Sequence, residues 1–98
     1  MRPPALDEAA LLEALQHLPH WQYNPPALEA TFHFADEQRC LRYLAALNQE
    51  ADRLDHHPQI LHSGNAVTLR WWTHSVQAIT ALDVQAAELS ETLASTLR

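Results

Sequence analysis

The sequence predicts an α+β domain in which a four-stranded antiparallel sheet carries three helices on one face. Two observations lead to this prediction. Segments with helical periodicity and segments that alternate between apolar and polar residues follow one another in the order αββαββα. In addition, the chain has 98 residues, which is enough for one hydrophobic core, so we expect residues 1–98 to form a single domain.

The first third of the chain contains a helix and two strands. A helix is expected at about residues 7–17, because Asp7 is a residue type that caps helices, leucines follow it at spacings of three and four, and Pro19 ends the run. A short strand is expected at 20–23, and a stronger one at 27–34, where apolar and polar residues alternate. The side of that strand expected to face the core carries Leu28, Ala30, Phe32 and Phe34.

The longest helix is expected at about residues 36–54, with Asp36 as its N-cap. Its apolar residues recur at spacings of three and four, and charged residues occupy the opposite face, so one face packs on the sheet. The single cysteine, Cys40, lies on the apolar stripe and has no second cysteine with which to pair. We therefore expect it to be a small core residue.

Two more strands and a helix complete the chain. The strands are expected at 59–62 and 67–72, joined by a turn in which Gly64 takes the positive φ that tight hairpins require. The last helix is expected at about 83–96, with Asp83 as its N-cap. If Val67, Leu69 and Trp71 face the core, Arg70 and Trp72 point to the uncovered face of the sheet. An aromatic residue there favours a ligand or a second subunit.

Composition excludes several classes of function. The net charge is −6 and the basic residues are scattered, which argues against direct binding of nucleic acid. No run approaches the roughly 18 apolar residues that span a membrane, and the N-terminus lacks the apolar core of a signal peptide, so we expect a soluble cytoplasmic protein. One glycine is too few for a glycine-rich phosphate loop.

The stretch Asp52-Arg53-Leu54-Asp55-His56-His57-Pro58 carries the strongest chemical signal. Histidine exchanges its proton near neutral pH, so two adjacent imidazoles after a helix, with His74 at the end of a later strand, suit general acid–base catalysis. Neighbouring residues in an extended chain point to opposite sides, so His56 and His57 are expected to do different jobs. Asp52 lies one helical turn before His56 and could orient that ring or bind a donor on a substrate.

The alternatives are a metal site and a simple polar surface. Three histidines can hold zinc, but no HxH, HxxxH or HExxH pattern occurs, so we expect no metal. The remaining histidines are interpreted as surface residues, although His62 could line the edge of a pocket; they are His17, His20, His33 and His62. Trp21 and Trp71 are expected in the core. Trp72 is left open between a subunit interface, a wall of the site and partial exposure.

Taken together, Asp52-x-x-x-His56-His57-Pro58, a hairpin, Thr73-His74 and Asp83 resemble the pterin-4a-carbinolamine dehydratase family. This family is also known as the dimerization cofactor of a hepatocyte homeodomain transcription factor. The resemblance covers most of the chain. Shorter matches lie at Leu18-Pro19-x-Trp21, Phe32-x-Phe34 and Ile79-Thr80 before Asp83. The family fold has the same αββαββα order.

The resemblance implies a function. His56, His57 and His74 match the three active-site histidines and are predicted to be catalytic. Predicted to bind substrate are Asp52, Pro58, Asp83 and Trp72; Asp83 could also orient a histidine ring. The implied reaction is loss of water from a 4a-hydroxytetrahydropterin to give the quinonoid dihydropterin, which recycles tetrahydrobiopterin for aromatic amino acid hydroxylases. It needs no metal or organic cofactor. A homodimer or homotetramer is expected.

The chain departs from the family pattern at several positions. In a gapless match, Gly64 stands at the usual aromatic of the hairpin, Glu37 at a phenylalanine and Ala78 at a glycine. Trp71-Trp72 replaces smaller residues. These changes bear on substrate fit and assembly, and they leave room for an alternative function, a non-catalytic module of the same fold that dimerises or binds another protein.

Overall fold

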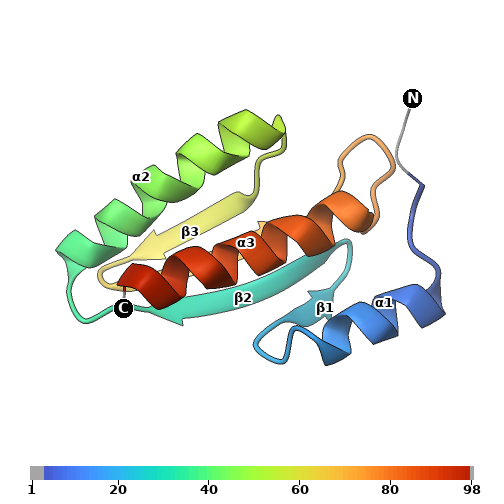
Figure 1. Cartoon of the computed structure of the whole chain (residues 1–98), viewed down its shortest axis with the longest axis horizontal. Coiled ribbons are helices and arrows are strands. Elements are labelled where there is room, and N and C mark those ends of the chain that lie inside the picture. Colours follow the sequence, from blue (N-terminus) through green and yellow to red (C-terminus); the bar gives the residue numbers. More distant parts are fainter. Residues whose placement is uncertain (1–3, 98) are drawn as a thin grey trace.

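The computed structural model describes residues 4–97, and it confirms the predicted α+β class and element order (Figure 1). The strands form one antiparallel sheet in the order β1-β2-β4-β3. The elements are α1 (Glu8–Gln16), β1 (Gln22–Asn24), β2 (Ala27–His33), α2 (Glu37–Leu54), β3 (Gln59–Ser63), β4 (Ala66–Trp71) and α3 (Ala81–Leu97).

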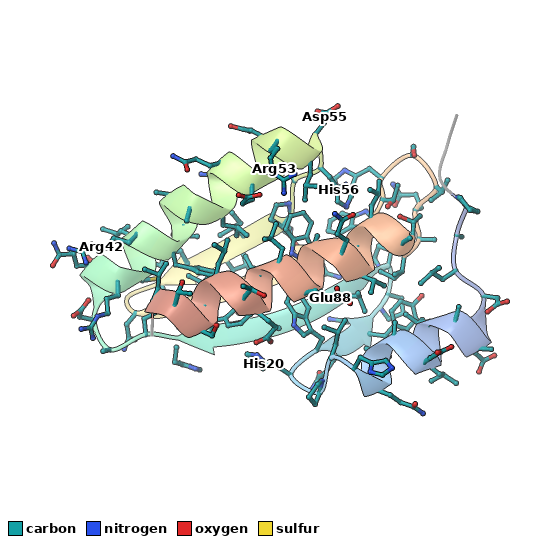
Figure 2. The ribbon with its side chains drawn as sticks, in the orientation of Figure 1. His20, Arg42, Arg53, Asp55, His56 and Glu88 are labelled. Carbon is teal, nitrogen blue, oxygen red and sulfur yellow. The ribbon has the colours of Figure 1, made fainter. Side chains whose placement is uncertain are left out.

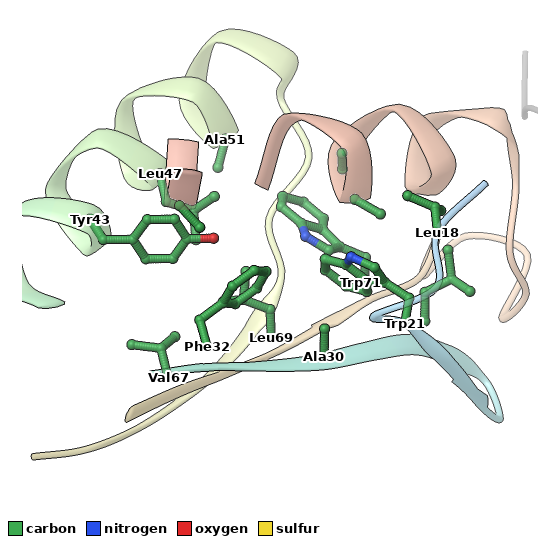
Figure 3. Packing of buried hydrophobic residues seen from close by; sticks show 14 of the residues in the cluster. Leu18, Trp21, Ala30, Phe32, Tyr43, Leu47, Ala51, Val67, Leu69 and Trp71 are labelled. Atoms are coloured by element: carbon green, nitrogen blue, oxygen red, sulfur yellow. The ribbon is translucent and has the colours of Figure 1, made fainter. Parts of the chain in front are cut away.

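Helices α2 and α3 lie side by side across one face of the sheet, while α1 lies next to β1 (Figure 1). The alternation in β2 and β4 sets this arrangement, because it turns one apolar row per strand toward the helices. The predicted core rows are buried, which confirms the assignment of faces: Leu28, Ala30, Phe32, Phe34, Val67, Leu69 and Trp71. Figure 3 shows Phe32, Val67 and Leu69 of the sheet next to Tyr43 and Leu47 of α2.

A hydrogen-bond network through Ser90 connects the two covering helices with β4. Trp71 Nε1 donates to Ser90 Oγ at 3.0 Å, and Tyr43 Oη donates to the Ser90 carbonyl at 3.0 Å. Ser90 Oγ in turn donates to the carbonyl of Ala86 at 2.7 Å. All of these groups are buried away from water, so the network supplies the hydrogen-bond partners that their polar atoms need. It also fixes Trp71 at the end of the strand that leads to His74.

Helices α1 and α2 begin where the sequence predicts. The carboxylate of Asp7 accepts a hydrogen bond from Ala10 N, and that of Asp36 accepts one from Arg39 N, both at 2.8 Å. The first strand is shifted from the predicted 20–23 to Gln22–Asn24. The reason is a backbone turn before the strand, in which Trp21 N donates to the carbonyl of Leu18 at 2.9 Å.

The prediction that Asp83 is the N-cap of the last helix is wrong. Helix α3 begins at Ala81, and Thr80 is its cap, because Thr80 Oγ1 accepts from Leu82 N at 3.2 Å. Asp83 lies in the first turn and its carboxylate accepts from Thr80 N at 2.9 Å. The two bonds form a variant of the capping box, in which aspartate takes the place of the usual glutamate and Thr80 Oγ1 accepts from Leu82 N instead of Asp83 N.

The assignments of Cys40, Trp21 and Trp71 to the core and of four histidines to the surface are confirmed. Cys40 is buried, and desolvation by burial raises the pKa of its thiol, with a smaller contribution from the charge of Glu37. Trp21 and Trp71 are core residues. The four histidines assigned to the surface are exposed. Within residues 4–97, no helix has the length and apolar character needed to cross a membrane.

Candidate active site

A cavity of about 370 Å³ opens where the end of α2 meets the connection between β4 and α3. All three histidines singled out in the sequence line it. Its lining residues are Asp55, His56, His57, Thr73, His74, Ser75 and Leu82. Figure 2 shows Asp55 and His56 at the end of α2, next to the segment that enters α3. The cavity therefore brings together two segments that are far apart in the chain.

The end of α2 aims His56 into this region. Asp55 adopts the left-handed conformation, with φ 51° and ψ 43°, which ends the helix. Its N–H donates to the carbonyls of Ala51 and Asp52, and His56 N donates to the carbonyl of Ala51 at 3.1 Å. These bonds form a Schellman-type ending, and aspartate tolerates the left-handed conformation better than most residues. The chain consequently turns back toward the sheet at His56.

His56 forms a buried pair with Asp83. Its Nε2 lies 2.6 Å from Asp83 Oδ1, and the two side chains are 10% and 0% exposed. The other carboxylate oxygen accepts from Thr73 Oγ1 at 2.8 Å and from Thr80 N at 2.9 Å. Because an ionised carboxylate only accepts, Nε2 of His56 carries a proton. In the neutral ring, Nδ1 is then the nitrogen with a free electron pair.

Trp71 supports the same ring from one side. The two rings stack with their centroids 5.3 Å apart and their planes inclined by 27°. Since Trp71 is held by Ser90, the position of His56 depends on the core and on Asp83. The expectation that Asp83 could orient a histidine agrees with this geometry, although Asp83 itself is too deeply buried to line the cavity.

His57 has a different partner. Its Nε2 lies 2.8 Å from Asp52 Oδ1, and both side chains are mostly exposed, at 53% and 77%. Of the two roles left open for Asp52, binding a donor on a substrate stays a prediction, and the interpretation that it could orient the ring of His56 is contradicted. That interpretation assumed that helical spacing continues past Asp55, whereas the left-handed residue rotates the chain so that the next histidine faces Asp52 instead.

His74 extends from the end of β4 and is exposed. Its ring stacks on Trp72 with centroids 4.4 Å apart and an interplanar angle of 20°. Trp72 and Pro58 are both partly buried, and neither is a lining residue of the cavity. Trp72 thus stands behind His74. That Trp72 and Pro58 bind substrate stays a prediction.

Four lining residues were not among the predicted site residues: Asp55, Thr73, Ser75 and Leu82. Asp55, Thr73 and Ser75 are next to predicted histidines in the sequence, and this proximity could have identified them as lining residues. Leu82 lies in the first turn of α3 and had no such signal. The hairpin turn contributes nothing to the lining: Gly64, at φ 58°, lies at the far end of β3, and the ring of His62 bonds to the carbonyl of Gly64 at 2.8 Å (Figure 1).

The side chains that line the cavity are of types that can exchange protons. Its lining polar side chains are three imidazoles, one carboxylate and two hydroxyls, and neither lysine nor arginine is among its lining residues. Its volume lies within the range typical of small-molecule sites, about 300–1,000 Å³. Across residues 4–97, no group of three or more histidine, cysteine, aspartate or glutamate side chains is placed to hold a metal ion.

Comparison with known proteins identifies relatives of the whole domain. Residues 4–93 match the family described as pterin 4 alpha carbinolamine dehydratase. A provisionally named pterin-4-alpha-carbinolamine dehydratase of Metallosphaera sedula is 33% identical over 85 residues, which cover 87% of this chain and 88% of the relative. A second provisionally named pterin-4-alpha-carbinolamine dehydratase, from Brucella ovis, is 32% identical over 91 residues, which cover 91% of this chain and 94% of the relative.

Two solved structures share the fold. One, described as a transcriptional coactivator/pterin dehydratase from Brucella melitensis, has a TM-score of 0.90 and 31% identity, covering 93% of this chain and 99% of the other. The second is a pterin dehydratase-like protein described as a RuBisCO assembly factor in the alpha-carboxysome. It has a TM-score of 0.64 and 23% identity over 76% of this chain and 86% of its own, and it supports the fold alone.

Proposed function

We propose that this chain, which belongs to the pterin 4 alpha carbinolamine dehydratase family, removes water from a 4a-hydroxytetrahydropterin by histidine acid–base catalysis. The observation that carries the proposal is the convergence of His56, His57 and His74 on one cavity of about 370 Å³, which is a suitable size for a two-ring heterocycle. We infer that the reaction recycles tetrahydrobiopterin in the cytoplasm, and that the protein acts as a homodimer or homotetramer.

The reaction requires two proton transfers. The bond between C4a and the hydroxyl oxygen breaks as an acid protonates the leaving hydroxyl, which departs as water. A base removes the proton from the neighbouring ring nitrogen. The electron pair of that N–H bond stays with the nitrogen and allows the new double bond between nitrogen and C4a of the quinonoid dihydropterin to form. No electrons are exchanged with another molecule, so protonated and neutral imidazoles are sufficient for the chemistry.

The surroundings of the rings suit them to these transfers. The Asp83 carboxylate fixes the proton of His56 on Nε2 and stabilises the imidazolium that forms when Nδ1 accepts a second proton. The pair formed by His57 and Asp52 is open to solvent, so it can exchange a proton with water once per turnover. His74 faces the same cavity from the other segment. Acid and base are left unassigned among the three rings.

Single histidine variants test the proposal. We expect the wild-type protein to accelerate loss of a 4a-hydroxytetrahydropterin generated in the cuvette and followed by its ultraviolet absorbance. His56→Ala, His57→Ala and His74→Ala should each lower turnover by about 10²–10⁴. His62→Ala is the matched control, because His62 is exposed on the hairpin and bonds only to its own turn among the described residues. A wild-type rate equal to that of buffer would refute the proposal.

A second candidate function is a non-catalytic module that associates with another protein. The observation that favours it is the double description of the Brucella melitensis relative as a coactivator and a dehydratase. The two candidates differ in ligand binding. A module without activity would neither accelerate the dehydration nor bind a reduced pterin in calorimetry, whereas the proposed enzyme does both.

A further inference from the structure

One of the three cavity histidines is oriented in a different way from the others. His56 is bonded to Asp83 and His57 to Asp52. Within residues 4–97, neither ring nitrogen of His74 has a hydrogen-bonding partner, and its contact with Trp72 is the interaction that fixes the ring plane. The backbone around it is held, since the His74 carbonyl accepts from Gln77 Nε2 at 2.8 Å, but this bond leaves the torsions of the His74 side chain free.

The indole that contacts His74 is itself held by a cation. The guanidinium carbon of Arg70 lies 5.5 Å from the centroid of the Trp72 ring, within the range of a cation–π contact. The Nε1–H of Trp72 is buried and has no acceptor among the described residues, so packing, and not a hydrogen bond, sets the position of the indole. Arg70, Trp72 and His74 therefore form a row that ends at the cavity.

Arg70 is anchored to the three other strands of the sheet. Its Nη2 donates to the carbonyl of Asn24 in β1, and its Nη1 donates to Gln59 Oε1 in β3, both at 3.1 Å. Its Nε lies 3.1 Å from Glu29 Oε1 in β2, an ion pair without the geometry of a hydrogen bond. An arginine tied at three points loses most of its side-chain freedom, so it offers a fixed surface for the indole to pack on.

We propose that Trp72 is a positioning residue for His74, and that Arg70 fixes Trp72 for this purpose. The inference rests on the proposed function, since it assigns to Trp72 the role that carboxylates have for the other two histidines. The indole covers one face of the imidazole and restricts its rotation about the side-chain bonds, which leaves the ring edges open to the cavity. Trp72 acts through His74 and does not itself contact the substrate.

Two substitutions of Trp72 separate stacking from bulk. Trp72→Phe keeps an aromatic face behind His74, whereas Trp72→Leu keeps apolar volume without a ring. We expect Trp72→Leu to lower kcat by about two- to tenfold, the range that corresponds to loss of one aromatic pair, with KM changed by less than about twofold. Trp72→Phe should restore kcat to within about twofold of the wild type. Leu61→Ala, at an exposed position of β3 on the same face of the sheet, should change neither constant.

A measurement without substrate tests the stack directly. In NMR spectra of the full-length protein, the indole should shift the ring protons of His74 upfield. Trp72→Leu should remove that shift, Trp72→Phe should keep part of it, and the resonances of His56 should move in neither variant. Amide spectra of the variants confirm that the fold is retained.

The outcomes are decisive for the positioning role. Unchanged kcat in Trp72→Leu, an effect on KM alone, or His74 resonances that do not respond to the substitution would each overturn it. If the wild-type protein does not dehydrate the pterin, the proposed function fails by itself. The NMR spectra then still decide whether Trp72 holds the ring of His74.

Discussion

Replacing Asp83 with asparagine tests whether one carboxylate serves both the fold and the site. Asp83 is fully buried, and its two oxygens accept from His56 Nε2, Thr73 Oγ1 and Thr80 N. Asparagine has nearly the same shape, but only one of its two terminal atoms can accept. If the amide oxygen keeps the bonds to Thr73 and Thr80, the amide nitrogen faces His56 and donates to it. Nε2 must then accept, and the proton of the neutral ring moves to Nδ1.

The expected losses follow from this change of hydrogen bonding. Hydrogen bonds to a charged group contribute about 1.5–3 kcal/mol each, so we expect the free energy of unfolding to fall by about 2–4 kcal/mol. A domain of this size has roughly 5–15 kcal/mol in total, so most of the variant remains folded. Turnover should fall by about 10²–10⁴, because His56 is held in the wrong tautomer.

Urea unfolding followed by circular dichroism gives the free energy, and initial rates on the 4a-hydroxytetrahydropterin give kcat. Rates are corrected for the folded fraction, so that the loss of stability is not counted as a loss of chemistry. The reasoning would be refuted by an Asp83→Asn protein with kcat within twofold of the wild type. A variant that loses activity but keeps the full free energy of unfolding would refute only the prediction that Asp83 stabilises the fold.

Three further predictions concern other parts of the chain. Ser90→Ala leaves the buried Nε1–H of Trp71 without an acceptor, so thermal unfolding should show a loss of about 1–3 kcal/mol. Burial raises the pKa of the Cys40 thiol above its ordinary 9.0, so the folded state keeps a proton that the unfolded chain releases. The free energy of unfolding should therefore fall as the pH rises above about 9, and less steeply in Cys40→Ala. Asp52→Asn should lower turnover by at most about fivefold and leave stability nearly unchanged, because its pair with His57 is exposed.

The parts of the fold that sequence could predict are those governed by local periodicity. The alternation in residues 27–34 and 67–71 assigned each side chain of β2 and β4 to the correct face. The caps Asp7 and Asp36 marked the starts of α1 and α2. The start of α3 was misplaced because Thr80 and Asp83 both belong to residue types that cap helices. The pattern Thr-x-x-Asp, read as a capping box, was the signal that distinguishes them.

The sequence singled out the three histidines that line the cavity and Asp83 as a residue that could orient a ring, but it did not single out Asp52 as the partner of His57. The possibility that Asp52 orients His56 depended on helical spacing, which a left-handed residue at Asp55 interrupts. The alternation of β4 placed Trp72 on the uncovered face, but periodicity does not tell how far a side chain lies from the residue two positions later. The stack on His74 is a tertiary contact, and only the structure gives its distance.

The partners divide the site into a part coupled to folding and a part that is not. Asp83 closes the capping box of α3 and holds His56, so substitutions that disturb Thr80, Thr73 or Asp83 should reduce stability and activity together. Asp52 is on the surface and its carboxylate bonds to His57, so its substitution should reduce activity alone. This difference allows the two pairs to be distinguished by experiment. If stability and activity fall together, the substituted residue belongs to the buried pair of His56 and Asp83, which the fold holds in a single geometry. If activity falls while stability is kept, it belongs to the exposed pair of His57 and Asp52, which exchanges protons with solvent.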